Sequence, residues 1–260
     1  TAPGHMGAVR DAPELHADIA FVGSSMVESA RTLMDRLWTV LPPSPAVRAR
    51  VQQVMQLQSQ RLDRWMVPAL MDRLLPGVRA RAQAAHGGLD PALLIGEHIA
   101  ALRRLNVLAP LVPLGLKVWG DAGWSLLHDK GADWRGPADH FRDIPTIYRH
   151  AKINVDIGRI YQQDIVTMRV FDVLGAGGFL LAEHSDALAE LFTIGEELDT
   201  WRTTEELVHK AKLYLQNPAL RDRIAAAGHA RVLRDHTIAA RVEQILQTLG
   251  LAHPTPRPIP

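Results

Sequence analysis

The sequence predicts an α/β fold: a doubly wound parallel sheet with a large helical insertion after its first strand. Short apolar runs ending in glycine alternate with helical segments, a pattern typical of parallel sheets. After the first run, residues 26–113 show helical periodicity and no strand pattern. Apolar residues make up 47% of the 260-residue chain and charged residues 22%, which is ordinary globular composition.

The first strand is expected within 18–25, an apolar run that ends in glycine and two serines. Such a run is typical of a buried parallel strand followed by a tight turn. Residues 116–120, 152–157 and 178–182 repeat the strand pattern. Strands of this kind present their ligand sites at their carboxyl ends.

The helical insertion is read from three apolar stripes at helical spacing. They are Leu33, Leu37, Val40 and Leu41; Val47, Val51, Val54, Met55 and Leu62; and Ile95, Ile99, Leu102 and Leu105. Asp90 before Pro91 is a typical helix start.

Further helices are expected at 143–150, at 167–175 and from Thr203 onward. Thr203 lies three residues before Glu206, the spacing of a capping box, and Asn217 before Pro218 is another N-cap signal.

We therefore divide the chain into a sheet domain, a helical insertion and two terminal segments. The sheet domain comprises 18–25 and 114–250, and the insertion comprises 26–113. Residues 1–17, with a cloning remnant expected at 4–6, are treated as a tag or linker. Residues 251–260, rich in proline, are expected to form a flexible tail.

The composition excludes several classes of protein. The chain has 29 Lys and Arg against 28 Asp and Glu, so its net charge of +1 argues against a nucleic-acid-binding protein. It has no cysteine, which excludes disulfides, thiolate metal sites and cysteine nucleophiles. No apolar run approaches the ~20 residues of a membrane span, and no signal peptide is visible. We expect a cytoplasmic protein.

Glycines lie at or near the expected strand–helix junctions: Gly23, Gly120, Gly136, Gly177 and Gly178. Glycine lets the backbone approach a ligand closely, and helix N-termini favour anions. The alternative interpretation is that each glycine only permits a turn. The sequence has no Walker motif, no G-x-G-x-x-G, no D-x-D and no H-x-x-x-H pair. These absences argue against an ATPase, a nicotinamide dehydrogenase and a metal site.

Arg169 and Asp172 lie three residues apart and share one face of the expected helix. They form either a surface ion pair worth ~0.3–0.5 kcal/mol, or a site where the arginine binds phosphate and the carboxylate binds ribose hydroxyls. His184 follows an expected strand and is either an ordinary loop histidine or a donor contact.

The segment 168–181 resembles the donor-site signature R-x-F-E-x-x-A-x-G-x-F-L-L of the CgeB-type glycosyltransferases, in the group-one superfamily of GT-B fold. Similarity extends over 18–246 and is loosest in 26–113. Other matching residues include Lys152, Ile153, Asn154, Glu206, Leu207, Tyr214, Arg221, Gly228, Arg231, His236 and Thr237. Two departures from the pattern stand out: Asp172 replaces the usual glutamate, and Asp156 stands where asparagine is common.

The resemblance implies a Rossmann-like half that binds a nucleotide-sugar donor, most often UDP-linked, for hexosyl transfer without a metal. Gly23 and Ser24 would face the diphosphate, which Lys152 and Arg169 would neutralise as the glycosidic bond breaks. Asp172 would bind the ribose. The segment with Gly120, Trp124 and Gly136 would frame the base, and Gly177 and Gly178 would belong to the donor site.

A complete GT-B enzyme has two such halves, and only one is recognisable here. The resemblance therefore implies that the acceptor-binding half is missing, or lies on another chain, and that the isolated chain is incomplete as an enzyme.

An alternative function is a non-catalytic interaction module acting through the insertion. Residues 46–81 contain seven arginines and two aspartates, a net charge of +5. They form either solvated helix faces or a docking surface for an acidic partner, an anionic membrane face or the missing domain.

Overall fold

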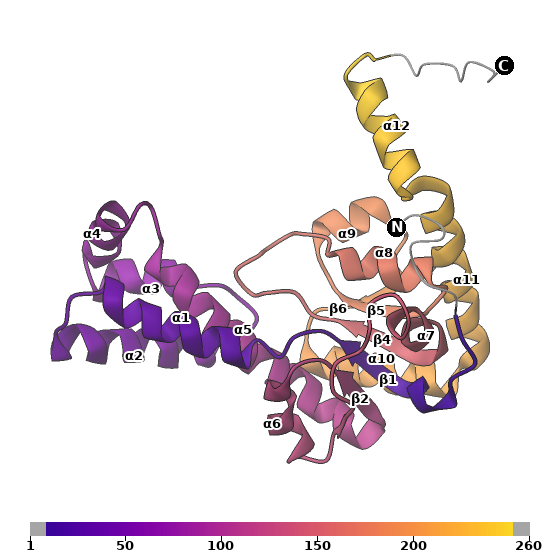
Figure 1. Ribbon diagram of the computed structural model, residues 1–260, viewed down its shortest axis with the longest axis horizontal. Coiled ribbons are helices and arrows are strands. Elements are labelled where there is room, and N and C mark those ends of the chain that lie inside the picture. Colours follow the sequence, from indigo (N-terminus) through magenta and orange to yellow (C-terminus); the bar gives the residue numbers. More distant parts are fainter. Residues whose placement is uncertain (1–8, 252–260) are drawn as a thin grey trace.

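The computed structural model describes residues 9–251 (Figure 1). The expected cloning remnant at 4–6 and the expected tail beyond 251 lie outside the described residues. The first strand begins at Ala17, and the segment before it also packs on the fold. Ala12 is buried, and the backbone N–H of Arg10 donates to Thr146 Oγ1 at 3.0 Å.

All the strands of the sheet are parallel, as predicted. The strands are β1 (Ala17–Val22), β2 (Leu116–Trp119), β3 (Asp133–Trp134), β4 (Ala151–Asp156), β5 (Leu180–Glu183) and β6 (Asp199–Trp201). Their order in space is β3-β2-β1-β4-β5-β6. This is the Rossmann order, in which the chain reverses its direction of progress between β1 and β4.

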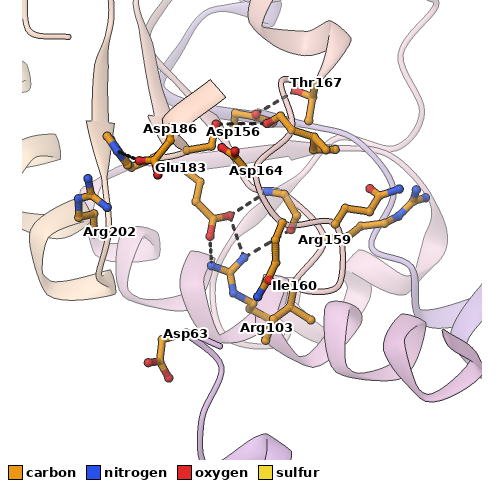
Figure 2. Close-up of a pocket in the computed structure, with 16 residues that line it drawn as sticks. Asp63, Arg103, Asp156, Arg159, Ile160, Asp164, Thr167, Glu183, Asp186 and Arg202 are labelled. Atoms are coloured by element: carbon orange, nitrogen blue, oxygen red, sulfur yellow. Dashed lines mark hydrogen bonds and ion pairs between the residues drawn. The ribbon is translucent and has the colours of Figure 1, made fainter. Parts of the chain in front are cut away.

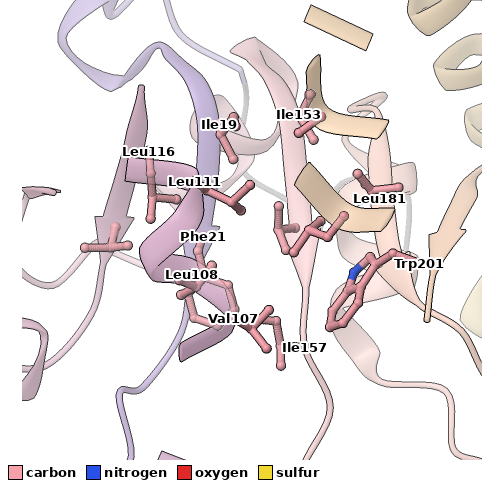
Figure 3. Packing of buried hydrophobic residues seen from close by; sticks show 14 of the residues in the cluster. Ile19, Phe21, Val107, Leu108, Leu111, Leu116, Ile153, Ile157, Leu181 and Trp201 are labelled. Carbon is pink, nitrogen blue, oxygen red and sulfur yellow. The ribbon is translucent and has the colours of Figure 1, made fainter. Parts of the chain in front are cut away.

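Helices cover both faces of the sheet, which confirms the doubly wound arrangement. On one face, Ile19, Phe21 and Leu181 pack against helices α5 (Pro91–Leu108) and α10 (Thr204–Gln216) (Figure 3). On the other face, Ala20 and Leu180 pack against α7 (Ile144–His150) and α8 (Met168–Gly175). Burial of these apolar side chains on both faces is the main stabilisation of the sheet.

The sheet domain has further helices around this core. They are α6 (Ser125–His128), α9 (Asp186–Leu191), α11 (Pro218–Asp235), α12 (Ile238–Thr248), and the 3-10 helices Pro13–Leu15, Ala109–Leu114 and Ala122–Trp124. Helix α12 projects from the body beyond α11 (Figure 1).

The insertion after β1 is a helical subdomain with a core of its own, as predicted. Its helices are α1 (Val27–Val40), α2 (Pro45–Ser59), α3 (Val67–Leu74), α4 (Val78–Ala85) and α5, of which mainly the first half packs in this core. It extends to one side of the sheet (Figure 1). Leu37, Val51, Val54 and Met71 are fully buried within it.

Helix α5 belongs to both cores. Its Ile95 and Ile99 pack in the helical subdomain, whereas Val107 and Leu108 pack on the sheet. Asp90 caps its start, as predicted, by accepting the backbone N–H of Ala92 at 2.9 Å.

Three local features differ from what the sequence predicts: two short strands and one helix cap. Strands β3 and β6 were not predicted, because two or three residues are too few for a strand periodicity to show. Asn217 precedes α11 but does not cap it; its side chain donates to Leu213 of the preceding helix instead.

Gly177 and Gly178 end helix α8 in a Schellman motif. The backbone N–H of Gly177 donates to Leu174 and that of Gly178 donates to Val173. Gly177 has φ +77°, in the left-handed region that favours glycine. A Cβ at Gly178 would lie 2.2 Å from the carbonyl oxygen of Tyr148.

We expect Gly178→Ala to lower the free energy of unfolding by at least about 2 kcal/mol, because backbone has to move to admit the methyl group. Gly136→Ala is the control: Gly136 has φ +74° with nothing near the added Cβ, so only backbone strain of about 1 kcal/mol is expected. Urea denaturation of both variants measures the difference, and equal losses would contradict the close approach at Gly178.

Candidate functional site

The carboxyl ends of the strands bring most of the sequence-predicted residues together beside the β1–β4 switch point. A Cβ built on Gly23 would lie 2.7 Å from Arg169 Nη2, and one built on Gly120 would lie 2.1 Å from the Gly23 carbonyl oxygen. The N–H of Gly120 donates to Gly136 at 2.9 Å. Ser24 follows Gly23 directly. In doubly wound sheets the crevice at this position is where ligands bind.

Arg169 is held by an acid that the sequence interpretation did not pair with it. Its Nη1 forms an ion pair with Asp156 at the end of β4, and its Nε donates to the Val22 carbonyl at 3.0 Å. Burial alone would lower the pKa of Arg169, but the negative charge of Asp156 raises it overall. Thr167 also donates to Asp156, at 3.0 Å. The arginine therefore joins β1, β4 and α8 and is not half of a simple surface pair.

The β1–α1 turn already binds a carboxylate. Asp121 accepts the hydroxyls of Ser24 and Ser25 and the backbone N–H groups of Ser25 and Gly123. Burial alone would raise the pKa of Asp121, but these hydrogen bonds lower it overall. Ser24 is exposed at this turn, and its hydroxyl donates to Asp121 at 2.6 Å.

Trp124 does not frame a base. Its side chain is 0% exposed, packs edge-on against Phe21, and donates from Nε1 to the Gly23 carbonyl at 2.8 Å. A fully buried indole has no face left for a nucleobase. The strong burial of tryptophan in cores explains the misassignment.

Three other predicted residues lie at the opposite edge of the sheet. Lys152 is near the start of β4, where its ammonium forms an ion pair with Asp18 at 2.6 Å. With ~3.3 Å per strand residue, Lys152 lies roughly 13 Å from Asp156 at the other end of β4. Gly177 and Gly178 precede β5 at the same edge. Lys152, Gly177 and Gly178, which were expected in one site with Arg169, are therefore separated from it by the length of the sheet strands.

Asp172 is half-buried in the middle of α8, one turn after Arg169. Its charge acts on the neighbouring Tyr148, whose pKa is raised to about 12 chiefly by burial, with a further contribution from Asp172. It does not line the pocket described next.

A pocket of about 470 Å³ opens outside the ends of β4 and β5 (Figure 2). Its lining residues are Asp63, Arg103, Asp156, Gly158, Arg159, Ile160, Gln162, Gln163, Asp164, Ile165, Thr167, Glu183, His184, Ser185, Asp186 and Arg202. His184, left open by the sequence, lines the pocket with Nδ1 3.2 Å from Thr200 Oγ1. The volume lies in the ~300–1,000 Å³ range of small-molecule sites.

Arg103 of α5 fixes one wall of this pocket (Figure 2). It forms a two-pronged ion pair with Glu183 of β5, donates to the Leu62 carbonyl at 2.7 Å, and is 5% exposed. The other Glu183 contact is the backbone N–H of Gly158, at 2.9 Å. Sequence reasoning missed Arg103 and Glu183. The available signal was a pair of arginines, Arg103 and Arg104, within an otherwise apolar helix.

The β4–α8 loop, residues 157–167, forms the opposite wall and is anchored on the helical subdomain. Ile160 is buried in that subdomain's core, and the Tyr161 hydroxyl donates to Glu97 of α5. Arg159, 43% exposed, lies 3.5 Å from the same glutamate and faces the pocket. The insertion therefore shapes the pocket on both sides.

Within residues 9–251, no cluster of three or more His, Asp or Glu side chains could hold a metal ion. No helix in that part of the chain has the length and apolar character needed to cross a membrane.

The chain is similar to solved structures of the Anabaena protein Alr3699/HepE. The structure in complex with UDP is 15% identical, with a TM-score of 0.46 over 56% of this chain and 43% of the other. The structure with UDP-glucose is 16% identical, with the same TM-score and coverage. The chain thus spans less than half the length of these proteins. No curated protein matches it.

Residues 98–247 match the family model described as glycosyl transferase-like. The match begins in α5, covers the strands from β2 onward, and ends in α12. It includes more than half of the chain and all the pocket-lining residues except Asp63. The chain therefore belongs to the glycosyl transferase-like family.

Proposed function

We propose that this chain is the donor-binding part of a glycosyltransferase and binds a nucleoside-diphosphate sugar. The observation that carries the proposal is the position of the pocket, at the carboxyl ends of β4 and β5 and beside the N-terminus of α8. A helix N-terminus and arginines favour phosphate groups. We assign the chain to the CgeB-type branch and the donor to UDP-sugars because of the signature in 168–181.

The donor would lie along the edge of the sheet. Its diphosphate would lie near Arg169 and Thr167, and its sugar would enter the pocket towards Arg159 and Glu183. The base and ribose would lie on the other side, towards Gly120, Gly136 and Asp172. This arrangement uses the switch-point crevice for the nucleotide and the pocket for the hexose, and it requires no metal.

Transfer to an acceptor needs a second substrate held in line with the donor, and aligning two reactants lowers the barrier by several kcal/mol. We infer that this alignment comes from a further domain or a partner chain, and that the reaction takes place in the cytoplasm.

The first test is binding of UDP to the wild-type chain. UDP at ~100 times its dissociation constant should stabilise the fold by ~2.7 kcal/mol, since it binds only the folded state. Thermal melting with millimolar UDP measures this. An unchanged melting temperature would contradict the proposal and favour an interaction module acting through the basic helices.

The second test addresses the ribose contact. We expect Asp172→Ala to weaken UDP and uridine by similar factors, roughly tenfold, because the ribose is common to both ligands. Asp172→Glu should preserve both affinities. Asp35→Ala, an exposed aspartate on α1, is the control. Isothermal titration calorimetry measures both affinities. An unchanged affinity for uridine in Asp172→Ala would contradict the proposed contact between Asp172 and the ribose.

A further inference from the structure

Arg104 is a buried cation without an acidic partner. It lies in the second half of α5 and is 7% exposed. Its guanidinium donates to two backbone carbonyls, those of Ser24 after β1 and Ile157 after β4. Its Nε–H has no hydrogen-bond partner, and Arg104 forms no ion pair with any residue in 9–251.

The neighbouring charges leave Arg104 uncompensated. Arg104 and Arg169 both lie over the Phe21 ring, at 5.7 and 5.1 Å from its centroid. Two acids lie near Arg104, and each has its own arginine: Asp156 pairs with Arg169, and Glu97 pairs with Arg159. Burial and the charge of Arg169 lower the pKa of Arg104 to about 10. Three arginines and two acids therefore meet near the β1–β4 switch point.

Arg103, the preceding residue of α5, shows the contrast. It is as buried as Arg104, but it pairs with Glu183 through two nitrogens. A buried charge without a partner is strongly unfavourable, whereas a paired one is tolerated. The same helix turn thus holds one arginine whose charge is balanced by the protein and one whose charge is not.

We propose that Arg104 is a phosphate-binding residue of the donor site, supplied by the helical insertion, and that the diphosphate of the nucleotide balances its charge. The inference rests on the proposed function and adds that the insertion is part of the donor site. Between the ends of β1 and β4, Arg104 lies where the crevice of a Rossmann sheet receives the anionic part of its ligand. A diphosphate there would accept from both Arg104 and Arg169.

The test compares Arg104→Met with Arg103→Met and Arg36→Met, each in the full chain. Arg36 is an exposed arginine of α1, so its replacement removes the same charge from the insertion without touching the site. The readouts are the ligand-free melting temperature and titrations with UDP, uridine and inorganic pyrophosphate.

We expect Arg104→Met to weaken UDP and pyrophosphate roughly ten- to a hundredfold and to leave uridine unchanged, because a charge-assisted contact to phosphate is lost. Its ligand-free melting temperature should equal or exceed that of the wild type, since an unbalanced buried charge is removed. Arg103→Met should melt lower, and Arg36→Met should match the wild type in every readout.

An unchanged ratio of UDP to uridine affinity in Arg104→Met would overturn the inference, whatever its melting temperature. If that variant does not fold, the neutral variant Arg104→Gln replaces it, and an unchanged ratio would again be contradictory. If wild-type protein binds no UDP, the proposed function fails separately. Titration with pyrophosphate then decides. If the wild type binds pyrophosphate and Arg104→Met does not, the result supports Arg104 as a phosphate-binding residue. If the wild type does not bind pyrophosphate, the inference is overturned.

Discussion

Helix α5 is the constraint on which the rest of the structure depends. Its first half completes the core of the helical subdomain through Ile95 and Ile99, and its second half covers the sheet through Val107 and Leu108. At the junction of the two cores, Arg103 and Arg104 are buried where apolar residues would be expected. Their guanidinium groups contact the carbonyls of Ser24 and Ile157 and the carboxylate of Glu183. All of these groups lie at the carboxyl edge of the sheet.

The polar groups at this edge fall into two classes. Groups of the first class have their charge or hydrogen-bonding partners within the fold. Arg169 pairs with Asp156, Arg103 pairs with Glu183, and Asp121 accepts from nearby serine and glycine donors. They fix the ends of β1, β4 and β5, and replacing Arg169 alone would leave Asp156 buried without its ion-pair partner, at a cost of about 3–5 kcal/mol. Arg104, together with the exposed Arg202, supplies positive charge that such pairs do not balance.

The sequence was sufficient for four of the six strands and for the insertion, because apolar runs and helical stripes are local patterns. It also placed Gly23, Gly120, Gly136 and Arg169 in one expected site. These residues are neighbours in the structure, because the carboxyl ends of parallel strands lie at one edge of the sheet. It placed Lys152, Gly177 and Gly178 in the same site, but these residues lie at the other edge of the sheet. It failed for the ion pair between Arg103 and Glu183, since partners 80 residues apart carry no local signal.

Hydrogen exchange of the backbone amides with and without UDP measures whether the nucleotide binds at the carboxyl edge of the sheet. We expect slower exchange with UDP in 23–27 and 157–170, the segments that follow β1 and β4. We expect no change at the other edge, in the segments around Leu116 and Lys152 that line a second pocket of about 480 Å³. Protection confined to that second pocket, or no protection anywhere, would contradict binding at the carboxyl edge.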